Sequence, residues 1–590
     1  MSSYPISTTR HSLAHIMAQA VKSLYPDVKL AIGPDIENGF YYDFDFGEVK
    51  FEEAALKDIE KKMKNIIKQN QKFEHSTMPV DEAIKFLESK GEPYKVEMAR
   101  DLKAGGETEI GFYRNISQQG AEAFVDMCRG PHVEKTIEID ENTFKLDKIA
   151  GAYWKGSEKN KMLTRIYALA FETREELEHH LKMFEEAKKR DHRILGKKLK
   201  LFTISELIGA GLPLMQPKGM IIRKAIEDYL WEMHADKEYH RVWTPHIAKE
   251  ALYECSGHAA KFGDELFRVQ GKDEAFIMKP MNCPHHMQIF ADNQFSYRDM
   301  PIRYFEPATV YRDEKTGQLS GLTRVRSITQ DDGHLFCRVG QIKDEVTTIV
   351  SIIKQFYTTM GMMEGYWVSL SVRGEDKSKY LGTDEAWNTA ENALEDAAKA
   401  NSLNYKRIEG EAAFYGPKLD FMFRDAIGRQ WQLATIQCDF NLPERFDLSF
   451  INEKNEKERP VVIHRAIAGS LERFMGIMIE HFAGTFPLWL APVQTVVVPV
   501  SENFFGYAQE VQDSLKKAGI RSELDNSNDG LNKKVRNAET SHTNYILVVG
   551  EKEMNEKSVA VRNYKTKEQS EVKLVNFIEN IQKEIENKRL

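Results

Sequence analysis

Apolar residues recur at helical spacing near the start of the chain and in short strand-like runs near its end. Between His11 and Pro26 they lie three and four positions apart, a spacing that predicts a helix with an apolar face. Beyond residue 490 the runs T-V-V-V-P-V, I-R-S-E-L, Y-I-L-V-V-G and S-V-A-V-R alternate with helical patterns, and residues 574–589 predict a closing helix. This alternation predicts a parallel-type α/β module of about a hundred residues.

Two changes of pattern divide the chain. From Glu172 the sequence becomes densely charged with apolar residues at helical spacing, which predicts an exposed connecting helix, although an ordinary surface helix has the same pattern. The proline-bounded segment 487–492 marks the second change. We therefore predict four parts: residues 1–170, a linker helix over 171–196, a central body over 197–488 and a C-terminal module over 489–590.

The middle of the chain contains a predicted hairpin with several charges. Residues 309–314 have strand composition, 315–321 are turn residues, and 322–330 alternate as a return strand. Arg312 and Arg324 would then extend from paired strands toward a common anion. Because the planar guanidinium suits phosphate oxygens, a nucleotide polyphosphate is the expected ligand. The alternative is a surface hairpin with solvated charges.

Composition agrees with a globular enzyme of several domains. Hydrophobic residues make up 42% and charged residues 29% of the 590 residues, which is ordinary for soluble proteins. Five cysteines form no disulfide pattern, and neither a signal peptide nor a membrane segment is expected, so we predict a cytoplasmic protein. A net charge of -8 argues against bulk attraction to nucleic acid but leaves room for local basic surfaces.

Three residues far apart in the sequence could bind a metal. Cys283, His334 and His464 would offer zinc one sulfur and two nitrogens and leave a fourth position open, as in working zinc sites. Taken singly, the cysteine is more often a buried thiol and either histidine an ordinary core or surface residue. Their spacing is no short metal motif.

A second group lies nearer the N-terminus. His11 and His15 are four positions apart and point the same way from a helix, and Cys128 and His132 follow in D-M-C-R-G-P-H. From residue chemistry alone, these two pairs predict a zinc site with four ligands.

In combination, these segments resemble the threonyl-tRNA synthetases among the class II aminoacyl-tRNA synthetases. Arg312 matches the motif 2 arginine, Arg473 in G-S-L-E-R-F the motif 3 arginine, and Pro245 in Y-H-R-V-W-T-P the motif 1 proline, which the family places at a dimer interface. The resemblance runs from about Arg10 to the C-terminus. It implies an α+β multidomain homodimer with a catalytic antiparallel β-sheet flanked by helices, an N-terminal α+β editing domain and a C-terminal α/β anticodon-binding domain.

The resemblance also implies roles in the catalytic domain. Arg312 would bind the α-phosphate of ATP, Arg324 and Arg473 the outer phosphates, and Glu314 the adenine amino group, with Mg²⁺ accompanying ATP. Cys283, His334 and His464 would hold one Zn²⁺ per subunit. Asp332 would accept a hydrogen bond from the hydroxyl of L-threonine. The remaining active-site lining would be Met281, Gln330, Tyr415, Lys418, Gln432 and Gln437, although F-Y-G-P around Tyr415 also fits a plain tight turn.

Zinc chemistry explains why such an enzyme needs a second active site. The amino and hydroxyl groups of threonine can chelate zinc, whereas valine has no hydroxyl, and a hydrophobic pocket alone separates such isosteres poorly. Serine chelates as well and lacks only a methyl group, a difference of about 1 to 3 kcal/mol. The family's editing domain hydrolyses seryl-tRNA, usually without metal, which we favour over a second zinc site. Its matching residues here are His11, His15, Lys95, Asp126, Cys128 and His132.

The C-terminal module matches the part of the family that grips the anticodon of tRNA(Thr). Asn528, Glu553 and Arg562 match positions that read anticodon bases, and hydrogen bonding to unpaired bases suits these side chains. Each could equally be a surface residue.

Two departures and two rivals accompany this interpretation. The sequence begins almost directly on the editing helix, so we expect the family's ubiquitin-like N-terminal domain to be absent. His285 replaces the glycine of N-C-P-G-H and could perturb the metal site or compete as a ligand.

One rival is a class II synthetase for another amino acid such as proline or serine, which need not carry the zinc set with this editing domain. The other is a non-catalytic RNA-binding or regulatory relative, which would tolerate loss of Arg312, Arg473 or a metal ligand.

Overall fold

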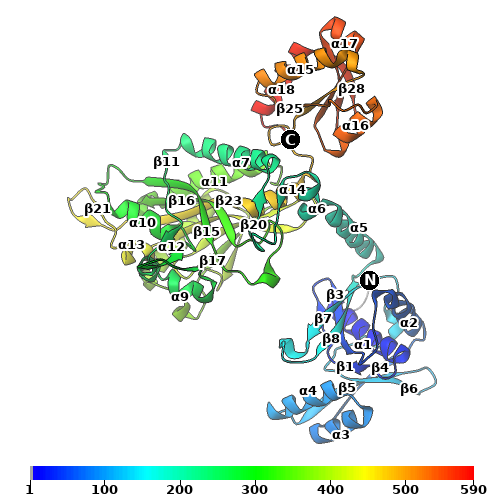
Figure 1. Ribbon diagram of the computed structural model, residues 1–590. Coiled ribbons are helices and arrows are strands. Elements are labelled where there is room, and N and C mark those ends of the chain that lie inside the picture. The colour runs from blue at the N-terminus through cyan, green and yellow to red at the C-terminus, as the bar shows by residue number, and fades with distance from the viewer. Residues whose placement is uncertain (1–3) are drawn as a thin grey trace. The chain divides into compact units, whose positions relative to one another are not determined.

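The computed structural model describes residues 4–590, and the chain divides into two compact units between Glu185 and Glu186 (Figure 1). The first unit mixes helices with antiparallel sheets, and the second holds a large, mainly antiparallel sheet and a C-terminal α/β module. The predicted fold class is therefore confirmed. The boundaries predicted at residues 170, 196 and 488 stay predictions.

The first unit is built around α1 (Ile6–Leu24), the helix predicted from the apolar spacing after His11. Buried residues surround α1, because a sheet and α2 (Leu56–Lys68) cover different sides of it. The sheet has the order β1-β3-β8-β7, formed by Lys29–Leu30, Gly39–Asp45, Met162–Ala170 and Phe144–Tyr153, and β2 (Asp35–Ile36) pairs with β3. Because α1 is covered on different sides, polar side chains on it are also buried inside the first unit.

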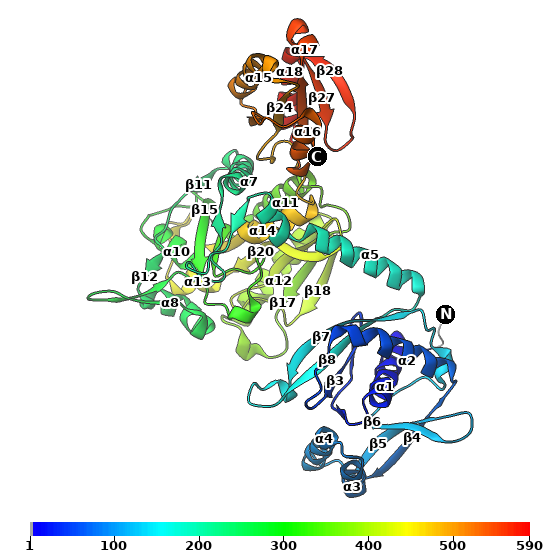
Figure 2. The same cartoon turned by 45° about the vertical axis from the view of Figure 1, so that its right-hand side comes forward.

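A second sheet completes the first unit. Its strands are β4 (Lys72–Pro79), β5 (Glu109–Ile116) and β6 (Glu122–Met127), and α3 (Val80–Lys90) and α4 (Pro93–Ala104) share an apolar core with it (Figure 2). Since β6 ends at Met127, Cys128 follows directly from a strand end.

The predicted linker helix over 171–196 is in fact two helices, α5 (Arg174–Arg190) and α6 (His192–Lys198). Asp191 breaks the helix with non-helical backbone angles, and its carboxylate accepts a hydrogen bond from the backbone N–H of Arg193 as the N-cap of α6. Leu177 is the one buried residue of α5, in line with an exposed connecting helix.

An eight-stranded sheet forms the centre of the second unit (Figure 2). Its order is β11 (Tyr239–Arg241), β15 (Ile302–Tyr311), β16 (Ser327–Cys337), β23 (Val461–Ser470), β20 (Gln430–Asp439), β19 (Lys418–Arg424), β17 (Trp367–Val372) and β18 (Tyr405–Glu409). The largest core joins this sheet to α7 (Pro217–Ala235), α11 (Ile342–Thr359), α12 (Asp384–Ala400) and α14 (Leu471–His481). Strand residues that alternate with the core positions face the opposite side of the sheet.

Shorter elements border that opposite side. They are α8 (Glu250–Ser256), α9 (His258–Phe262), α10 (Cys283–Ala291), α13 (Asn441–Arg445), β12 (Ile247–Ala248), β13 (Arg268–Gln270), β14 (Ala275–Met278), and the paired strands β21 (Phe450–Ile451) and β22 (Lys457–Glu458). The paired strands β9 (Phe202–Thr203) and β10 (Leu214–Met215) instead pack against the largest core.

The predicted hairpin exists, but its return strand begins later than expected. β15 ends at Tyr311 and β16 begins at Ser327, so both Arg312 and Arg324 lie in the connecting loop, residues 312–326. Leu322 and Val325, three positions apart, are buried within this loop. Their burial reflects loop packing, and the prediction of a strand from residue 322 was wrong.

The C-terminal module has five strands in the order β25 (Ser522–Leu524), β24 (Thr495–Pro499), β26 (Tyr545–Val549), β27 (Ser558–Asn563) and β28 (Gln569–Lys573). The first three are parallel, as predicted, whereas β27 pairs antiparallel with β26. β28 pairs antiparallel with β27, to which a short turn joins it. The helices are α15 (Phe505–Lys517), α16 (Leu531–Thr540), α17 (Glu551–Glu556) and α18 (Leu574–Glu586).

Within residues 4–590, no helix has both the length and the apolar character needed to cross a bilayer. All five cysteines are free thiols.

Candidate active site

Strand register brings distant candidate residues into one row. Lys418 on β19 lies opposite Gln437 on β20, Gln437 lies opposite His464 on β23, and His464 lies opposite His334 on β16. Side chains directly opposite one another on adjacent strands share a face of the sheet. One surface across four strands is therefore formed by Lys418, Gln437, His464 and His334.

The metal candidates meet at the end of this row. Cys283 opens α10, and its Sγ and one ring nitrogen each of His334 and His464 all lie within 4.8 Å of one another, in a buried position. The nearest nitrogens, His334 Nε2 and His464 Nδ1, are 2.9 Å apart. Burial raises the pKa of the Cys283 thiol and lowers the pKa of His334. One sulfur and two imidazoles converging in this way fit a zinc ion.

Outer hydrogen bonds prepare both histidines for a metal. His464 Nε2 is 2.8 Å from Oδ2 of Asp439, and a carboxylate can only accept there, so the lone pair of His464 is on Nδ1. Nε2 of His286 lies 3.0 Å from Oε2 of Glu306 and 2.9 Å from Nδ2 of Asn282. In the tautomer that donates from Nε2 to Glu306, Nδ1 of His286 accepts from Nδ1 of His334 at 2.8 Å. The lone pair of His334 is then on Nε2. Both free lone pairs face the same point.

Sequence reasoning missed these outer partners. Glu306 is buried, which acts to raise its pKa, but hydrogen bonds from His286 and Asn282 and the charge of Lys279 lower that pKa to about 2. A signal was available, because Asp439 lies two residues after Gln437 on the same strand and metal-bound histidines commonly have a carboxylate partner.

Two further histidines lie nearby. His258 at the start of α9 has its Nε2 3.6 Å from Cys283 Sγ, and burial lowers its pKa to about 3. His285 lies outside the metal-candidate group, with its ring 6.0 Å from that of Tyr253 and its pKa lowered to about 4, first by burial. The alternative that His285 competes as a metal ligand is not supported.

The two aspartates of Q-D-D-G-H, Asp331 and Asp332, point to opposite faces of β16. Asp332 faces the metal candidates, with Oδ2 3.8 Å from His334 Nδ1, and burial raises its pKa. Asp331 points the other way and accepts hydrogen bonds from the backbone N–H groups of 467–469. Burial raises the pKa of Asp331 to about 6. These three hydrogen bonds tie the Asp331 side chain to β23.

Two arginines present cations without a carboxylate partner among the described ion pairs. The guanidinium of Arg312 packs over Phe262, 4.8 Å from the ring centroid, and its Nη2 is 3.0 Å from Met281 Sδ. Arg473 lies in the first turn of α14 with its guanidinium 5.5 Å from the Trp431 centroid. Burial lowers both pKa values. Either group can therefore receive an anion.

The other arginine and the polar lining have partners. Arg324 pairs with Glu314 at 2.7 Å. The hydroxyl of Tyr415 donates to Gln437, and Lys418 pairs with Asp420 at 2.6 Å. Gln330 faces the site from β16, whereas Gln432 is exposed, five positions before Gln437 on β20.

The first unit brings three of its four predicted metal-type residues together. Cys128 Sγ is 3.1 Å from His11 Nε2 and 3.2 Å from His132 Nε2. His15 is not in that group; its ring lies 5.0 Å from that of His132 and edge-on to Phe73 and Phe124. The distances therefore bring three candidate ligands together instead of four, and metal-free editing stays a prediction.

Burial keeps this cluster uncharged at neutral pH. It raises the pKa of Cys128 to about 11 and lowers the pKa values of His11 and His132. Ser12, which sequence reasoning missed, has its hydroxyl 3.1 Å from His132 Nδ1. A cavity of about 640 Å³ opens beside Cys128.

A buried ion pair supports the cluster. Lys95 on α4 pairs with Asp126 on β6 at 2.9 Å, and the hydroxyl of Tyr42, also missed, donates to Asp126 at 2.6 Å. Lys95, Asp126 and Tyr42 are all buried, so the carboxylate of Asp126 holds the ammonium group of Lys95 inside the unit, away from solvent.

Comparisons with known proteins agree with this geometry. Residues 267–482 match the tRNA synthetase class II core domain (G, H, P, S and T), 494–584 the Anticodon binding domain, and 114–167 the Threonyl and Alanyl tRNA synthetase second additional domain. Threonine–tRNA ligase of Gloeobacter violaceus is 48% identical over 559 residues, 94% of this chain and 88% of that protein. That of Clostridium tetani is 46% identical over 98% of this chain and 88% of its own length.

The chain belongs to the threonine–tRNA ligase family. Among solved structures, the RNA binding domain of threonyl-tRNA synthetase from Cryptosporidium parvum Iowa II superimposes with a TM-score of 0.64 and 36% identity, covering 67% of this chain and 98% of that one. Prolyl-tRNA synthetase from Cryptosporidium parvum has a TM-score of 0.53 at 19% identity over 67% of this chain and 76% of that one, and so shares the fold.

In this member of the threonine–tRNA ligase family, the anticodon candidates lie on three separate segments. Asn528 is exposed in the loop before α16, Glu553 caps α17 through the backbone N–H of Gly550, and Arg562 on β27 pairs with Glu539 at 2.8 Å. Among the described contacts, no hydrogen bond or ion pair joins these three residues to one another.

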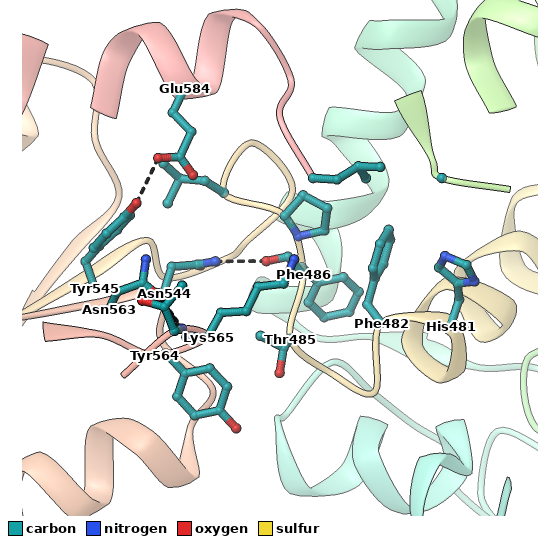
Figure 3. Close-up of a pocket in the computed structure, with 15 residues that line it drawn as sticks. His481, Phe482, Thr485, Phe486, Asn544, Tyr545, Asn563, Tyr564, Lys565 and Glu584 are labelled. Carbon is teal, nitrogen blue, oxygen red and sulfur yellow. Dashed lines mark hydrogen bonds between the residues drawn. The ribbon is translucent and has the colours of Figure 1, made fainter. Parts of the chain in front are cut away.

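A separate cavity of about 440 Å³ lies where the end of α14 faces the C-terminal module (Figure 3). Its polar contacts include the hydroxyl of Tyr545 donating to Glu584 and the amide of Asn544 donating to the Phe486 carbonyl. None of the site residues predicted from the sequence lines it among the described residues.

Proposed function

We propose that this protein ligates threonine to tRNA(Thr) at the expense of ATP and hydrolyses mischarged seryl-tRNA at a second site. The observation that carries the proposal is the convergence of Cys283, His334 and His464 beside the Gln437–Lys418 row, in a chain of the threonine–tRNA ligase family. The free cysteines support a reducing compartment, and we propose the cytoplasm.

The donor set fits one zinc ion per subunit, held by Cys283, His334 and His464. Bound there, zinc would act as a Lewis acid that chelates the amino and hydroxyl groups of threonine. Asp439 and the Glu306–His286 pair keep the imidazole lone pairs directed inward. Asp332 accepts a hydrogen bond from the threonine hydroxyl, which valine cannot provide.

Residues around ATP position and neutralise charge. The threonine carboxylate attacks the α-phosphorus and expels pyrophosphate, and the terminal ribose hydroxyl of tRNA then attacks the mixed anhydride and releases AMP. Arg312 binds the α-phosphate, Arg324 and Arg473 the outer phosphates, and Glu314 the adenine amino group, with Mg²⁺ on ATP. The unpaired guanidinium groups of Arg312 and Arg473 support this assignment. Met281, Gln330, Tyr415, Lys418, Gln432 and Gln437 line the substrate site.

In the first unit we propose hydrolysis of seryl-tRNA without metal. His11, Cys128 and His132 hold the ester and a water molecule, while Lys95 and Asp126 form the buried pair beneath them and His15 packs behind. The cavity beside Cys128 supports this proposal, because it offers room for the end of a tRNA. The rival is a second zinc ion on the three clustered residues. Metal analysis of the full chain separates the two: one zinc per chain supports metal-free editing, and two would overturn it.

The remaining assignments follow the predicted domain order. We propose residues 1–170 for editing, 171–196 as linker, 197–488 for catalysis and 489–590 for the anticodon, with Asn528, Glu553 and Arg562 as base-reading residues. Trp243 is 73% exposed two residues before Pro245, which supports a homodimer interface at this segment.

Amino-acid-dependent exchange of pyrophosphate into ATP tests the catalytic proposal. On zinc-replete protein we expect exchange with threonine, weaker exchange with serine, and none with valine or proline. Exchange with proline alone would favour a synthetase for another amino acid. No exchange with any of the four would favour a non-catalytic relative.

A further inference from the structure

His192, the first residue of α6, contacts both α14 and the 312–326 loop. Its Nδ1 is 2.6 Å from Oε1 of Glu480 on α14, and the backbone N–H of Leu322 donates to its Nε2 over 3.0 Å. The backbone N–H of His192 also donates to Glu480. One buried imidazole thus links the two segments that carry Arg324 and Arg473.

Hydrogen bonding determines which nitrogen carries the proton. A backbone N–H only donates, so Nε2 of His192 is unprotonated and its proton lies on Nδ1, which donates to Glu480. Asp191, His192 and Glu480 approach closely enough to hold a metal ion. His192 has no free lone pair for one, however, so the group serves as a structural link.

Two glycines make this contact possible. Gly321 has φ of +48°, and a Cβ there would overlap His192 Nε2. A Cβ at Gly476 on α14 would lie 3.3 Å from the Leu322 side chain and 3.6 Å from His192 Cδ2. The loop, α6 and α14 therefore approach more closely than larger residues at these positions would allow.

Further contacts lead from Glu480 toward Arg473. The second oxygen of Glu480 pairs with Arg429, whose Nε pairs with Asp425 at 2.7 Å. The same Asp425 oxygen accepts from Trp431 Nε1 at 2.9 Å, and Trp431 is the ring over which Arg473 packs. A continuous set of contacts thus joins the start of α6 to an ATP-binding candidate.

We propose that His192 is a positioning residue for ATP. By tying the 312–326 loop to α14, it sets the separation between Arg324 and Arg473, so α6, the second helix of the predicted linker, is part of the ATP site's support. This inference rests on the roles proposed above for those arginines.

Two substitutions separate its hydrogen bonds. In His192→Asn the amide nitrogen can replace Nδ1 and keep the bond to Glu480, but nothing reaches Leu322. In His192→Gln the amide oxygen can replace Nε2 and restore the bond to Leu322. Leaving a buried N–H unpaired is costly, so we expect H192N to raise the KM for ATP in pyrophosphate exchange roughly tenfold. H192Q should recover to within about threefold of wild type, with the KM for threonine and the zinc content unchanged in both.

Gly321→Ala tests the same contact from the loop without changing His192. We expect G321A to raise the KM for ATP as H192N does, and the double variant to add little, because both remove one interaction. His179→Asn is the matched control, since His179 is exposed on α5. It should match wild type.

The inference is overturned if H192N and H192Q behave alike, or if KM for ATP, KM for threonine and thermal stability change in parallel, as for a purely structural residue. Arg324→Ala and Arg473→Ala identify which proposal fails. If they leave the KM for ATP unchanged, the arginine roles are wrong. If they raise it while H192N does not, only the role of His192 is wrong.

Discussion

The metal candidates are poised for binding because each histidine has its outward nitrogen occupied. Asp439 and Glu306, the latter through His286, act as acceptors that leave His464 and His334 with inward lone pairs. A metal ion would then meet three ligands that need no rearrangement of protons on the imidazoles. Such outer partners contribute to affinity as well as to orientation.

Asp439→Asn should weaken zinc binding. Oδ1 of Asp439 accepts from the backbone N–H groups of Asn441 and Leu442, so an asparagine would keep its oxygen there and turn its NH₂ toward His464 Nε2. That donor forces the His464 proton onto Nδ1, where the metal binds. We expect zinc affinity to fall about 10- to 100-fold, measured by competition with a chromogenic chelator. The exposed Asp447→Asn is the control, and an unchanged affinity in D439N would contradict the orientation argument.

Arg312→Ala should abolish most adenylate formation while leaving zinc bound. Its guanidinium is held by Phe262 and lacks a carboxylate partner among the described residues, so its charge is available to the α-phosphate. Loss of a preorganised cation at a reacting centre costs about a hundredfold or more in rate. Threonine-dependent pyrophosphate exchange measures this, with the exposed Arg298→Ala as control. Retained exchange in R312A would refute its assignment.

At the scale of elements, α1 shows how packing changes the meaning of a pattern. Its apolar spacing predicted a helix with one buried face, yet thirteen of its residues, including polar ones, are buried. The reason is that α2 and a sheet enclose it from different sides. His15 is therefore a buried neutral residue, although it is one turn from His11.

Burial of His15 should make the first unit less stable in acid. Desolvation lowers its pKa from 6.5 to about 4, so between these values the unfolded state binds more protons than the folded state. This stabilisation is complete above pH 6.5 and is lost as the pH falls toward 4. From pH 7 to pH 5 we expect the opening free energy of α1 to drop by about 2 kcal/mol from His15 alone.

Hydrogen exchange of peptides covering α1, corrected for the intrinsic pH dependence of exchange, measures this loss. His15→Leu should reduce the pH dependence. An equal slope in wild type and variant would assign the acid sensitivity to other groups.

Element prediction succeeded where local pattern and packing agreed. The parallel strands of the C-terminal module and α1 follow directly from apolar spacing. It failed over residues 322–326, where buried Leu322 and Val325 belong to a loop, and at Asp191, where a capping side chain divides the linker helix. Both failures arise because neighbouring elements, or a single hydrogen bond, override the local signal.

At the scale of the whole molecule, we expect two chains to associate through the motif 1 segment. Trp243 is a large apolar side chain left 73% exposed in one chain, and burying it against a second copy would remove that surface from water. Light scattering after gel filtration should give twice the mass of one chain. Trp243→Glu should shift the protein toward a monomer, and a wild-type monomer would contradict the interface.

Residue order, apolar spacing and family resemblance were enough to predict the order of the parts, the fold class and the chemical groups of both candidate sites. Cys283, His334 and His464, or Cys128 and His132, can be selected as donors from residue type and family resemblance. The three-dimensional contacts show that His15 stays outside the close group of His11, Cys128 and His132, and that Asp331 and Asp332 point to opposite faces of β16. They also show that Asp439, Glu306 and His192 orient the groups around them. Strand register and helix contacts bring together residues more than a hundred positions apart, and local spacing carries no record of either.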